Sequence, residues 1–245
     1  MKSVLFVQFR TTPLRIAVEQ ARHRRALPPD VSLTFCSIFD FTDAAALLHK
    51  ARAYDALMFG GSGDFDIDGG RAPGDFGRTQ TPHILELIQD TVQDVLHEDK
   101  HFFGICFGHQ LVAELLGGKV THDHRQQKFG THTVLKLPDG DTDALFGTFP
   151  EVFYAQYWHK DSVTTLPQGA VTLAASPTCN FAALRYRQNV YTTQFHPEIA
   201  ATDIEGIPRR KTSYLAEPPA AIDMHESPEA ASLLSAFYAR LKNSR

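Results

Sequence analysis

Cys106 stands in the segment GICFGHQL, residues 104–111, with a glycine two residues before it and another two residues after it. An apolar run precedes the cysteine and a segment with helical spacing follows it, which predicts a strand, a sharp turn and a helix. Gly104 and Gly108 remove the side chains that would collide where strand and helix meet so closely. Cysteine at such a turn takes the place of the serine nucleophile in many hydrolases.

The chemistry expected at this turn is nucleophilic attack by a thiolate. The N-terminus of the following helix favours the ionised sulfur, which is the reactive form. The backbone N–H of Phe107 is placed to stabilise an oxyanion on the carbon that the sulfur attacks. The other interpretation is that Cys106 only fills a core position in a tight turn, because free cysteines are often buried.

A second motif bears on this choice, because a cysteine nucleophile needs a base and the base needs an orienting group. The segment QFHPE, residues 194–198, ends an apolar run. Pro197 biases His196 towards an extended backbone, in which residues two apart point the same way. The carboxylate of Glu198 can therefore lie beside the imidazole, fix its tautomer and stabilise its protonated form.

With both motifs in view, the chain resembles the class I glutamine amidotransferases, whose triad is Cys, His and Glu in this chain order. The segments LMFGGSGD and FGTHTVL resemble the oxyanion strand and a later strand of that family. YWHKDSVTTLPQGAVTLAAS resembles a segment of its GMP-synthetase-like branch. The resemblance implies that Cys106 is the nucleophile, that His196 is the base and then the acid, and that Glu198 orients the histidine.

The resemblance also assigns substrate contacts. It implies an oxyanion hole formed by the backbone of Gly61 and Phe107, and a γ-glutamyl pocket lined by Gly60 and Gln110. The implied reaction is attack on a side-chain amide, release of ammonia or an amine, and hydrolysis of a γ-glutamyl thioester. No cofactor and no metal ion is implied.

Four positions depart from the family's pattern: Ser62, Trp158, Lys160 and Thr192. The substrate contacts near Trp158 and Lys160 therefore stay open. Residues 64–80 and 201–226 have no counterpart in the family; we expect the first segment to cover the pocket and the second to form an irregular rim at its mouth. The cations Arg209, Arg210 and Lys211 either meet a substrate carboxylate there or form a solvated charge run.

Several other patterns favour ordinary structure over a site. GGSGDFDIDGG lacks the lysine of a phosphate-binding loop and the spaced glutamate of an EF-hand. His122 and His124 could hold a metal ion, but alternate histidines are commoner on an exposed strand. His159 and Asp161 either support the site or cap a turn. The basic residues 22–25 suit a solvated helix end.

The elements that must position these residues alternate between strand and helix. Strands are predicted at residues 3–9, 31–38, 55–61 and 101–106, and helices at 13–26, 40–54, 81–99 and 108–118. The later chain reads as strands at 132–137, 152–158, 170–176, 181–186 and 190–195, followed by a helix from Pro228. This order predicts an α/β fold with a single doubly wound, mostly parallel sheet of the flavodoxin or Rossmann kind, flanked by helices and carrying an antiparallel extension.

The domain organisation follows from the same pattern. No linker rich in glycine and serine divides the chain, so residues 1–245 are expected to form one domain. That domain would include the irregular segment 201–226 and a closing C-terminal helix.

Composition excludes several other classes. The 245 residues are 43% hydrophobic and 21% charged, which allows a sizeable core. A net charge of −4 gives no reason to expect nucleic acid, and no apolar stretch predicts a membrane span or a signal peptide. The three cysteines cannot all pair and match no metal knuckle, which indicates a reducing cytoplasmic setting.

The expected partner is therefore a small molecule, glutamine or another γ-glutamyl compound. No synthase domain fits in the remaining residues, so released ammonia would pass to a separate ammonia-accepting synthase subunit or to solvent. One alternative is a free-standing γ-glutamyl peptidase or hydrolase that is coupled to no synthase. An alternative of another class is a non-catalytic binding or regulatory homologue.

Overall fold

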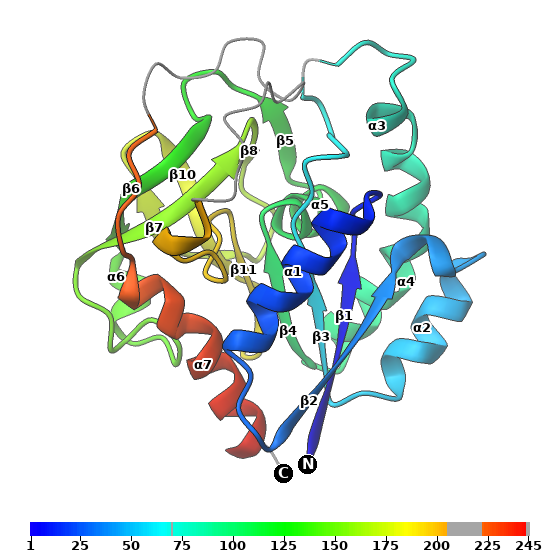
Figure 1. Ribbon diagram of the computed structural model, residues 1–245, viewed down its shortest axis with the longest axis horizontal. Helices are drawn as coiled ribbons and strands as arrows, with labels where there is room; N and C mark the ends of the chain where they lie inside the picture. Colours follow the sequence, from blue (N-terminus) through cyan, green and yellow to red (C-terminus); the bar gives the residue numbers. More distant parts are fainter. Residues whose placement is uncertain (70, 205–221, 244–245) are drawn as a thin grey trace.

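A nine-stranded sheet forms the centre of the fold in the computed structural model, which describes residues 1–69, 71–204 and 222–243. In spatial order the strands are β2 (Val31–Ser37), β1 (Lys2–Gln8), β3 (Ala56–Phe59), β4 (His101–Ile105), β11 (Val190–Thr193), β10 (Cys179–Arg185), β9 (Val171–Ser176), β6 (Lys128–Lys136) and β7 (Val152–His159). The first five strands run parallel to one another. Each of the other four runs antiparallel to its neighbours, which confirms the predicted α/β fold with its antiparallel extension (Figure 1).

Helices cover both faces of the parallel strands. One face carries α1 (Pro13–Arg25) and α7 (Pro228–Asn243), and the other carries α2 (Ala44–Arg52), α4 (Thr81–His97) and α5 (Phe107–Leu115). Strand residues alternate between the two cores, so Val4 and Phe6 face α7 while Leu5 and Val7 face α4. The apolar stripe predicted for α7 is confirmed, since its leucines and Phe237 are almost fully buried.

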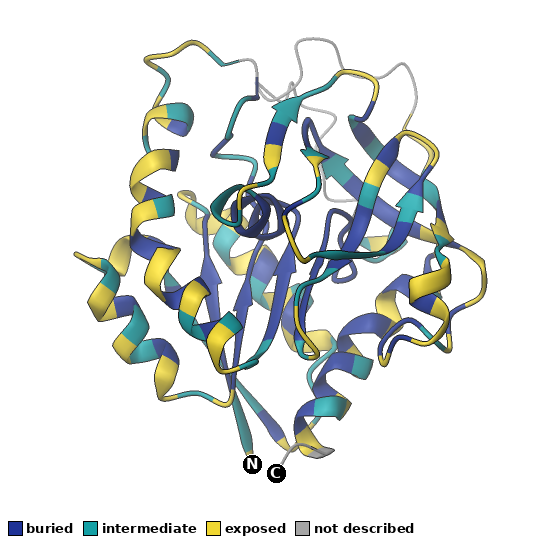
Figure 2. Ribbon diagram, turned by 180° about the vertical axis from the view of Figure 1, so that it is seen from behind, coloured by how far each residue is buried: buried dark blue, intermediate teal, exposed yellow. Residues whose placement is uncertain are grey.

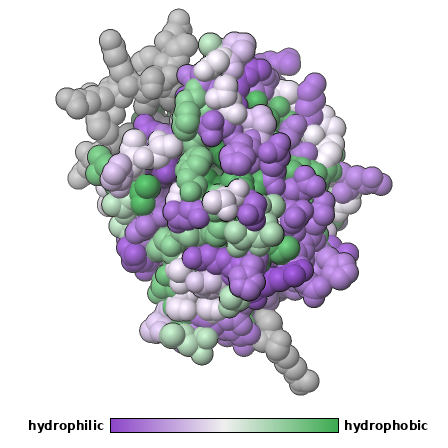
Figure 3. Space-filling model, turned by 90° about the vertical axis from the view of Figure 1, so that its right-hand side faces the viewer, coloured by the Kyte–Doolittle hydropathy of each residue, from purple (hydrophilic) through white to green (hydrophobic). Residues whose placement is uncertain are grey.

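Burial follows this layered arrangement (Figure 2). The central strands are buried along nearly their whole length, while the outward faces of the helices are exposed. The side of the molecule that carries α2 and α4 is mostly hydrophilic, with small apolar areas between the charged side chains (Figure 3). Within the described ranges, no helix combines the length and the apolar character that crossing a bilayer requires.

Several short elements were not predicted from the sequence. A second sheet pairs β5 (Lys119–His122) with β8 (Asp161–Thr165) in antiparallel fashion. Four further elements are single turns of helix: η1 (Ile38–Asp40), α3 (Phe76–Thr79), α6 (Pro138–Asp141) and η2 (Ala201–Ile204). All are too short to produce a hydrophobic period that a sequence pattern would reveal.

The prediction of a solvated basic end for α1 is wrong in part. His23 is only 1% exposed and packs against the ring of Phe6 at 4.3 Å between centroids. Arg22 and Arg25 both pair with Asp203 of η2, at 3.3 and 2.5 Å. The end of α1 therefore anchors the chain that leaves the predicted catalytic segment.

The segment predicted as an irregular rim is described only at its two ends. The last residues before α7 lie beside β6, where Asp223 O accepts a hydrogen bond from Thr131 N at 2.8 Å. His225 N donates to Thr131 Oγ1 at 2.9 Å. Arg209, Arg210 and Lys211 lie outside the described residues, so the two alternatives for them stay predictions.

Candidate active site

The turn between β4 and α5 has the predicted strand–turn–helix geometry. This arrangement, with the nucleophile at the sharp turn, is called a nucleophile elbow. Cys106 takes φ +52° and ψ −99°, a strained conformation for a residue with a side chain. A Cβ on Gly108 would lie 2.6 Å from the carbonyl oxygen of Phe59, and one on Gly104 would lie 2.9 Å from Thr192 Cγ2. Only glycine fits at these two positions, so α5 packs directly on the ends of its neighbouring strands.

Backbone hydrogen bonds fix the turn from both sides. Cys106 N donates to Thr193 O at 2.7 Å, and Gly108 N donates to Gly60 O at 3.2 Å. The sulfur is 3.8 Å from the carbonyl oxygen of Trp158, and the whole cysteine is only 2% exposed. The elbow is thus held by the two segments that also carry the predicted base and the predicted oxyanion glycine.

His196 and Glu198 form a buried pair directly after β11. His196 Nδ1 lies 2.7 Å from Glu198 Oε1, and the two residues are 4% and 5% exposed. Burial by itself would lower the pKa of His196, but the Glu198 carboxylate and the Cys106 sulfur raise it to about 10. Burial likewise opposes ionisation of Glu198, yet the charge of His196 lowers the pKa of that carboxyl to about 2. The pair is therefore an imidazolium and a carboxylate at neutral pH.

Two of the three predicted triad residues meet at Gly61. A Cβ built on Gly61 would lie 2.9 Å from His196 Cε1 and 3.4 Å from Cys106 Cβ, so both side chains pack closely against this glycine and leave no room for a side chain there. Among the described residues, no acceptor is found for the backbone N–H of Gly61 or of Phe107. Two unpaired donors beside the cysteine are what an oxyanion hole requires.

The other two predicted pocket residues are placed differently from each other. Gln110 is 4% exposed, and its amide nitrogen donates to Asp161 O at 2.6 Å and to Gln194 Oε1 at 3.1 Å. Gly60 faces away from the cysteine, since a Cβ there would meet the ring of Phe6 at 2.8 Å. Both residues support the walls of the site, and their contact with substrate stays a prediction.

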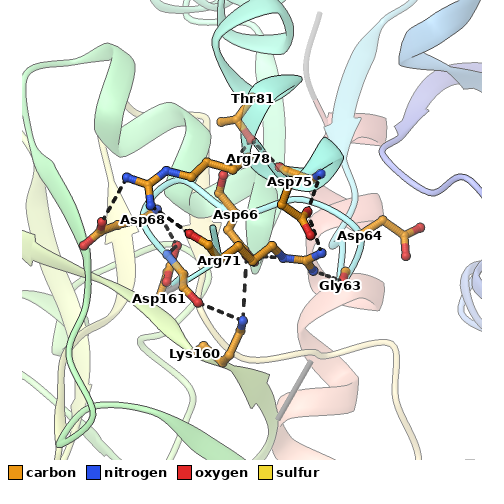
Figure 4. A network of polar contacts seen from close by, with 12 residues as sticks. Gly63, Asp64, Asp66, Asp68, Arg71, Asp75, Arg78, Thr81, Lys160 and Asp161 are labelled. Carbon is orange, nitrogen blue, oxygen red and sulfur yellow. Dashed lines mark hydrogen bonds and ion pairs between the residues drawn. The ribbon is translucent and has the colours of Figure 1, made fainter. Parts of the chain in front are cut away.

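The loop that follows the oxyanion glycines, predicted to cover the pocket, is clamped by the start of β8 (Figure 4). One carboxylate oxygen of Asp161 accepts hydrogen bonds from three successive backbone N–H groups, at 3.1 Å from Ile67, 2.8 Å from Asp68 and 2.9 Å from Gly69. Lys160 Nζ donates to Gly69 O at 2.9 Å. Asp161 therefore does more than cap a turn, because it fixes the loop beside the site.

A second set of charges stiffens the same loop from within. Arg71 binds the Asp66 carboxylate and donates to Gly63 O at 2.9 Å, while Asp75 accepts from Gly77 N at 2.8 Å. Thr81 Oγ1 donates to Asp66 O at 2.6 Å, which ties the loop to the first turn of α4. The Gly- and Asp-rich segment is thus an ion-paired loop.

The two histidines considered as metal ligands, and His159, which was considered as a support for the site, have protein partners. His122 Nε2 and His124 Nδ1 are 3.3 Å apart, and His122 Nδ1 is 3.6 Å from Asp161 Oδ1. His159 is fully buried, its Nδ1 lies 3.0 Å from Asp161 O, and burial lowers its pKa to about 3. Within the described ranges, no group of three or more histidine, cysteine or acidic side chains is suited to hold a metal ion.

One buried ion pair beside the site was missed by the sequence analysis. Arg10 Nε lies 2.9 Å from Glu19 Oε1, and the two side chains are 14% and 2% exposed. Gln8 Nε2 donates to the other oxygen of Glu19 at 2.8 Å. The available signal was an arginine placed directly after the first buried strand, at the end of the sheet where sites collect.

Two surface hollows lie away from this chemistry. One, of about 270 Å³, is lined by residues at the opposite end of the strands, such as Lys2 and His101. The other, of about 400 Å³, lies between Leu96, Leu116 and Tyr186. Neither is lined by a triad residue, so neither forms part of the candidate active site.

Comparison with known proteins agrees with this geometry. A family model described as "Glutamine amidotransferase class-I" matches residues 44–210, which is more than half of the chain. The chain belongs to the class I glutamine amidotransferases. The match covers both the elbow and the His196–Glu198 segment.

Curated relatives of this amidotransferase have a common description, that of a glutamine-hydrolyzing GMP synthase component. The chain is 32% identical over 120 residues to the relative from Methanocaldococcus jannaschii, covering 49% of this chain and 62% of that protein. It is also 32% identical over 127 residues to the relative from Methanopyrus kandleri, covering 51% of this chain and 64% of that protein. The chain thus spans less than two thirds of the length of these two relatives.

Solved structures share the fold over nearly the whole chain. A protein from Thermoplasma acidophilum, described as a GMP synthase component, superposes with a TM-score of 0.66 at 17% identity, covering 99% of this chain and 95% of that one. A glutamine amidotransferase from Thermotoga maritima superposes with a TM-score of 0.64 at 18% identity, covering 99% of both chains. At such identities the likeness concerns the fold alone.

Proposed function

We propose that this protein is a cysteine-dependent amidase that hydrolyses the side-chain amide of glutamine or of another γ-glutamyl compound. The observation that carries the proposal is the meeting of Cys106 and His196 at Gly61, together with the N–H groups of Gly61 and Phe107, for which no acceptor is found among the described residues. Family membership supports it, because class I amidotransferases in general hydrolyse glutamine.

In the first step Cys106, having transferred its thiol proton to His196, attacks the carbon of the side-chain amide as a thiolate. The developing oxyanion accepts hydrogen bonds from Gly61 and Phe107, whose positions are fixed before substrate enters. The imidazolium of His196 then donates its Nε2 proton to the amide nitrogen, and ammonia or an amine leaves. Glu198 keeps the proton on Nδ1 and stabilises the charged ring.

In the second step water hydrolyses the γ-glutamyl thioester. His196, now neutral, accepts a proton from the water as it attacks the same carbon. The same two N–H groups stabilise the second oxyanion. Cys106 leaves as thiolate and glutamate is released, so the net reaction consumes one water for each amide bond.

Two settings for this reaction are consistent with the observations. The curated relatives, described as separate GMP synthase components, favour an amidotransferase that delivers ammonia to a distinct synthase chain. A free-standing γ-glutamyl hydrolase is the alternative, and the position of Arg10 beside Gly61 favours it. Both settings use the same residues for the chemistry.

The test is hydrolysis by the Cys106→Ala variant, which lacks the nucleophile. We expect release of ammonia from glutamine, or of amine from γ-glutamyl compounds, to fall to the level of the buffer. A diazo-ketone analogue of glutamine should label Cys106 and spare Cys36 and Cys179, since burial raises the pKa of both those thiols to about 12. Full activity in the variant would exclude the proposal and favour a binding or regulatory role.

A further inference from the structure

The guanidinium of Arg10 lies close to the proposed catalytic residues. The point at which a Gly61 Cβ would stand lies 3.7 Å from Arg10 Nη2, as well as 2.9 Å from His196 Cε1. The guanidinium and the imidazole ring therefore both lie beside Gly61. No part of the catalytic cycle described above requires a cation at this position.

The arginine is held in place by its Nε edge. Glu19 Oε1 pairs with Arg10 Nε at 2.9 Å, and Gln8 Nε2 donates to the second oxygen of Glu19. The carboxylate is therefore fixed within the core. Within the described ranges, Nη2 donates no hydrogen bond to a protein group. The planar fork is therefore oriented by one edge and leaves Nη2 available beside Gly61, and such a fork binds carboxylates well.

The competing acids near Arg10 already have partners. Asp64 accepts hydrogen bonds from Thr11 N and Oγ1 at 2.9 and 3.0 Å and pairs with Arg15. Glu198 binds the imidazole of His196 through Oε1 at 2.7 Å, while its Oε2 is buried and has no hydrogen-bond partner in the described part of the chain. Among the described residues, neither acid accepts a hydrogen bond from Arg10 Nη2.

The position of His196 shows which part of a substrate would reach Arg10. The proton that His196 delivers goes to the departing nitrogen, so the leaving group must lie beside the Nε2–Cε1 edge of the ring. The Cε1 atom of that edge lies beside Gly61, and Arg10 Nη2 lies beside the same glycine. Ammonia is too small to use the arginine, whereas an amine that bears a carboxylate would reach it.

We propose that Arg10 is a specificity-determining residue that binds a carboxylate on the leaving amine, so that the preferred substrates are γ-glutamyl amino acids or peptides. This inference rests on the proposed γ-glutamyl hydrolase activity and gives it a substrate class. The bond that breaks joins the γ-carbonyl carbon to the amine nitrogen, and water supplies the hydroxyl of glutamate and a proton of the free amine. Glu19 is the positioning residue that orients Arg10.

The test compares two substrates that differ only in charge, γ-glutamylglycine and γ-glutamylglycinamide. Wild-type protein should show the higher kcat/KM on the carboxylate form. In Arg10→Met that ratio should fall by about 10- to 100-fold, the range expected for one charged hydrogen bond. Arg10→Lys should restore part of the ratio, and Glu19→Gln should lower it less than Arg10→Met does.

Each failure has its own signature. An equal loss of kcat/KM on both substrates in Arg10→Met would overturn the inference and make Arg10 a stabiliser of the oxyanion. A wild-type protein that does not prefer the carboxylate form would also overturn it, even with the hydrolase activity intact. If no γ-glutamyl compound is hydrolysed, the proposed function fails instead.

A binding measurement keeps the inference testable without turnover. In the Cys106→Ala background, calorimetric titration with γ-glutamylglycine should show that Arg10→Met weakens binding about 10- to 100-fold. The glycinamide serves as control and should bind both proteins alike. Weakening of both ligands together would contradict a contact with the carboxylate. Circular dichroism and the melting temperature of each variant show whether the chain is folded.

Discussion

The chain leaves β3 and β4 at the same end of the sheet, but the two exits are stabilised in opposite ways. After β4 the direction changes within one residue, and the turn is held by backbone contacts that only Gly104 and Gly108 permit. After β3 the chain forms a loop held by a side chain of β8, which lies 92 to 94 residues later in the sequence. The elbow is thus defined locally, and the loop is defined by distant partners.

This difference indicates which substitutions each part of the site tolerates. A turn held by steric fit fails when any atom is added, because packed interiors have no spare volume. A loop held by charged hydrogen bonds fails when its acceptor is removed, because the freed donors remain buried. The nucleophile is therefore expected to be sensitive to size, and the loop to be sensitive to charge.

The largest effect is expected from Gly108→Ala at the elbow. The new Cβ would lie 2.6 Å from Phe59 O, so α5 must move and carry the N–H of Phe107 with it. We expect kcat/KM to fall at least about 100-fold and stability to fall by about 3 kcal/mol. Gly74→Ala is the control, because no atom lies within 4 Å of the Cβ it adds. Near wild-type activity in Gly108→Ala would show that the elbow is not sterically limited.

A smaller effect is expected from Asp161→Ala in the clamp. Three backbone N–H groups lose a common acceptor, and the aspartate is only 3% exposed, so water cannot easily replace it. We expect a loss of about 2 kcal/mol in urea unfolding, and faster proteolytic cleavage within the loop. Asp90→Ala, on the exposed face of α4, should change the free energy of unfolding by less than about 0.5 kcal/mol. Equal stability of the two variants would contradict the clamp.

The smallest effect concerns the pH dependence of stability through His196 and Glu198. The raised pKa of His196, about 10, stabilises the fold fully below the ordinary value of 6.5 and less as pH rises towards 10. The lowered pKa of Glu198, about 2, stabilises it fully above 4.5 and less as pH falls towards 2. The contribution of the pair is therefore greatest between these ordinary values.

Glu198→Gln makes this prediction measurable. The stability of wild type should exceed that of the variant most at about pH 5 to 6, and the melting temperature should follow. The difference should shrink as the pH rises from 6.5 towards 10, because the unfolded histidine loses its proton while the folded one keeps it. A difference that stays constant with pH would mean that the pair contributes through packing and not through charge.

The sequence could predict most of the elbow and of the fold, for a physical reason that is visible in particular residues. Gly104, Cys106 and Gly108 interact with chain that is adjacent in sequence or in a neighbouring parallel strand, so their spacing carries the information. The stripe of α7, with Leu233 and Phe237, likewise follows from helical period alone. The prediction that residues 22–25 form a solvated helix end was wrong in part, because His23 is buried and Asp203, distant in sequence, binds Arg22 and Arg25.

The sequence by itself thus determined the strand–turn–helix at Cys106, the adjacency of His196 and Glu198, and the alternation that yields a parallel sheet. Only the tertiary structure decided that Asp161 clamps the loop after β3 and that Arg10 Nη2 lies beside Gly61. Local spacing determines local geometry because a short stretch of backbone has few conformations. Contacts between residues far apart in sequence depend on how whole elements pack, and no short pattern records that packing.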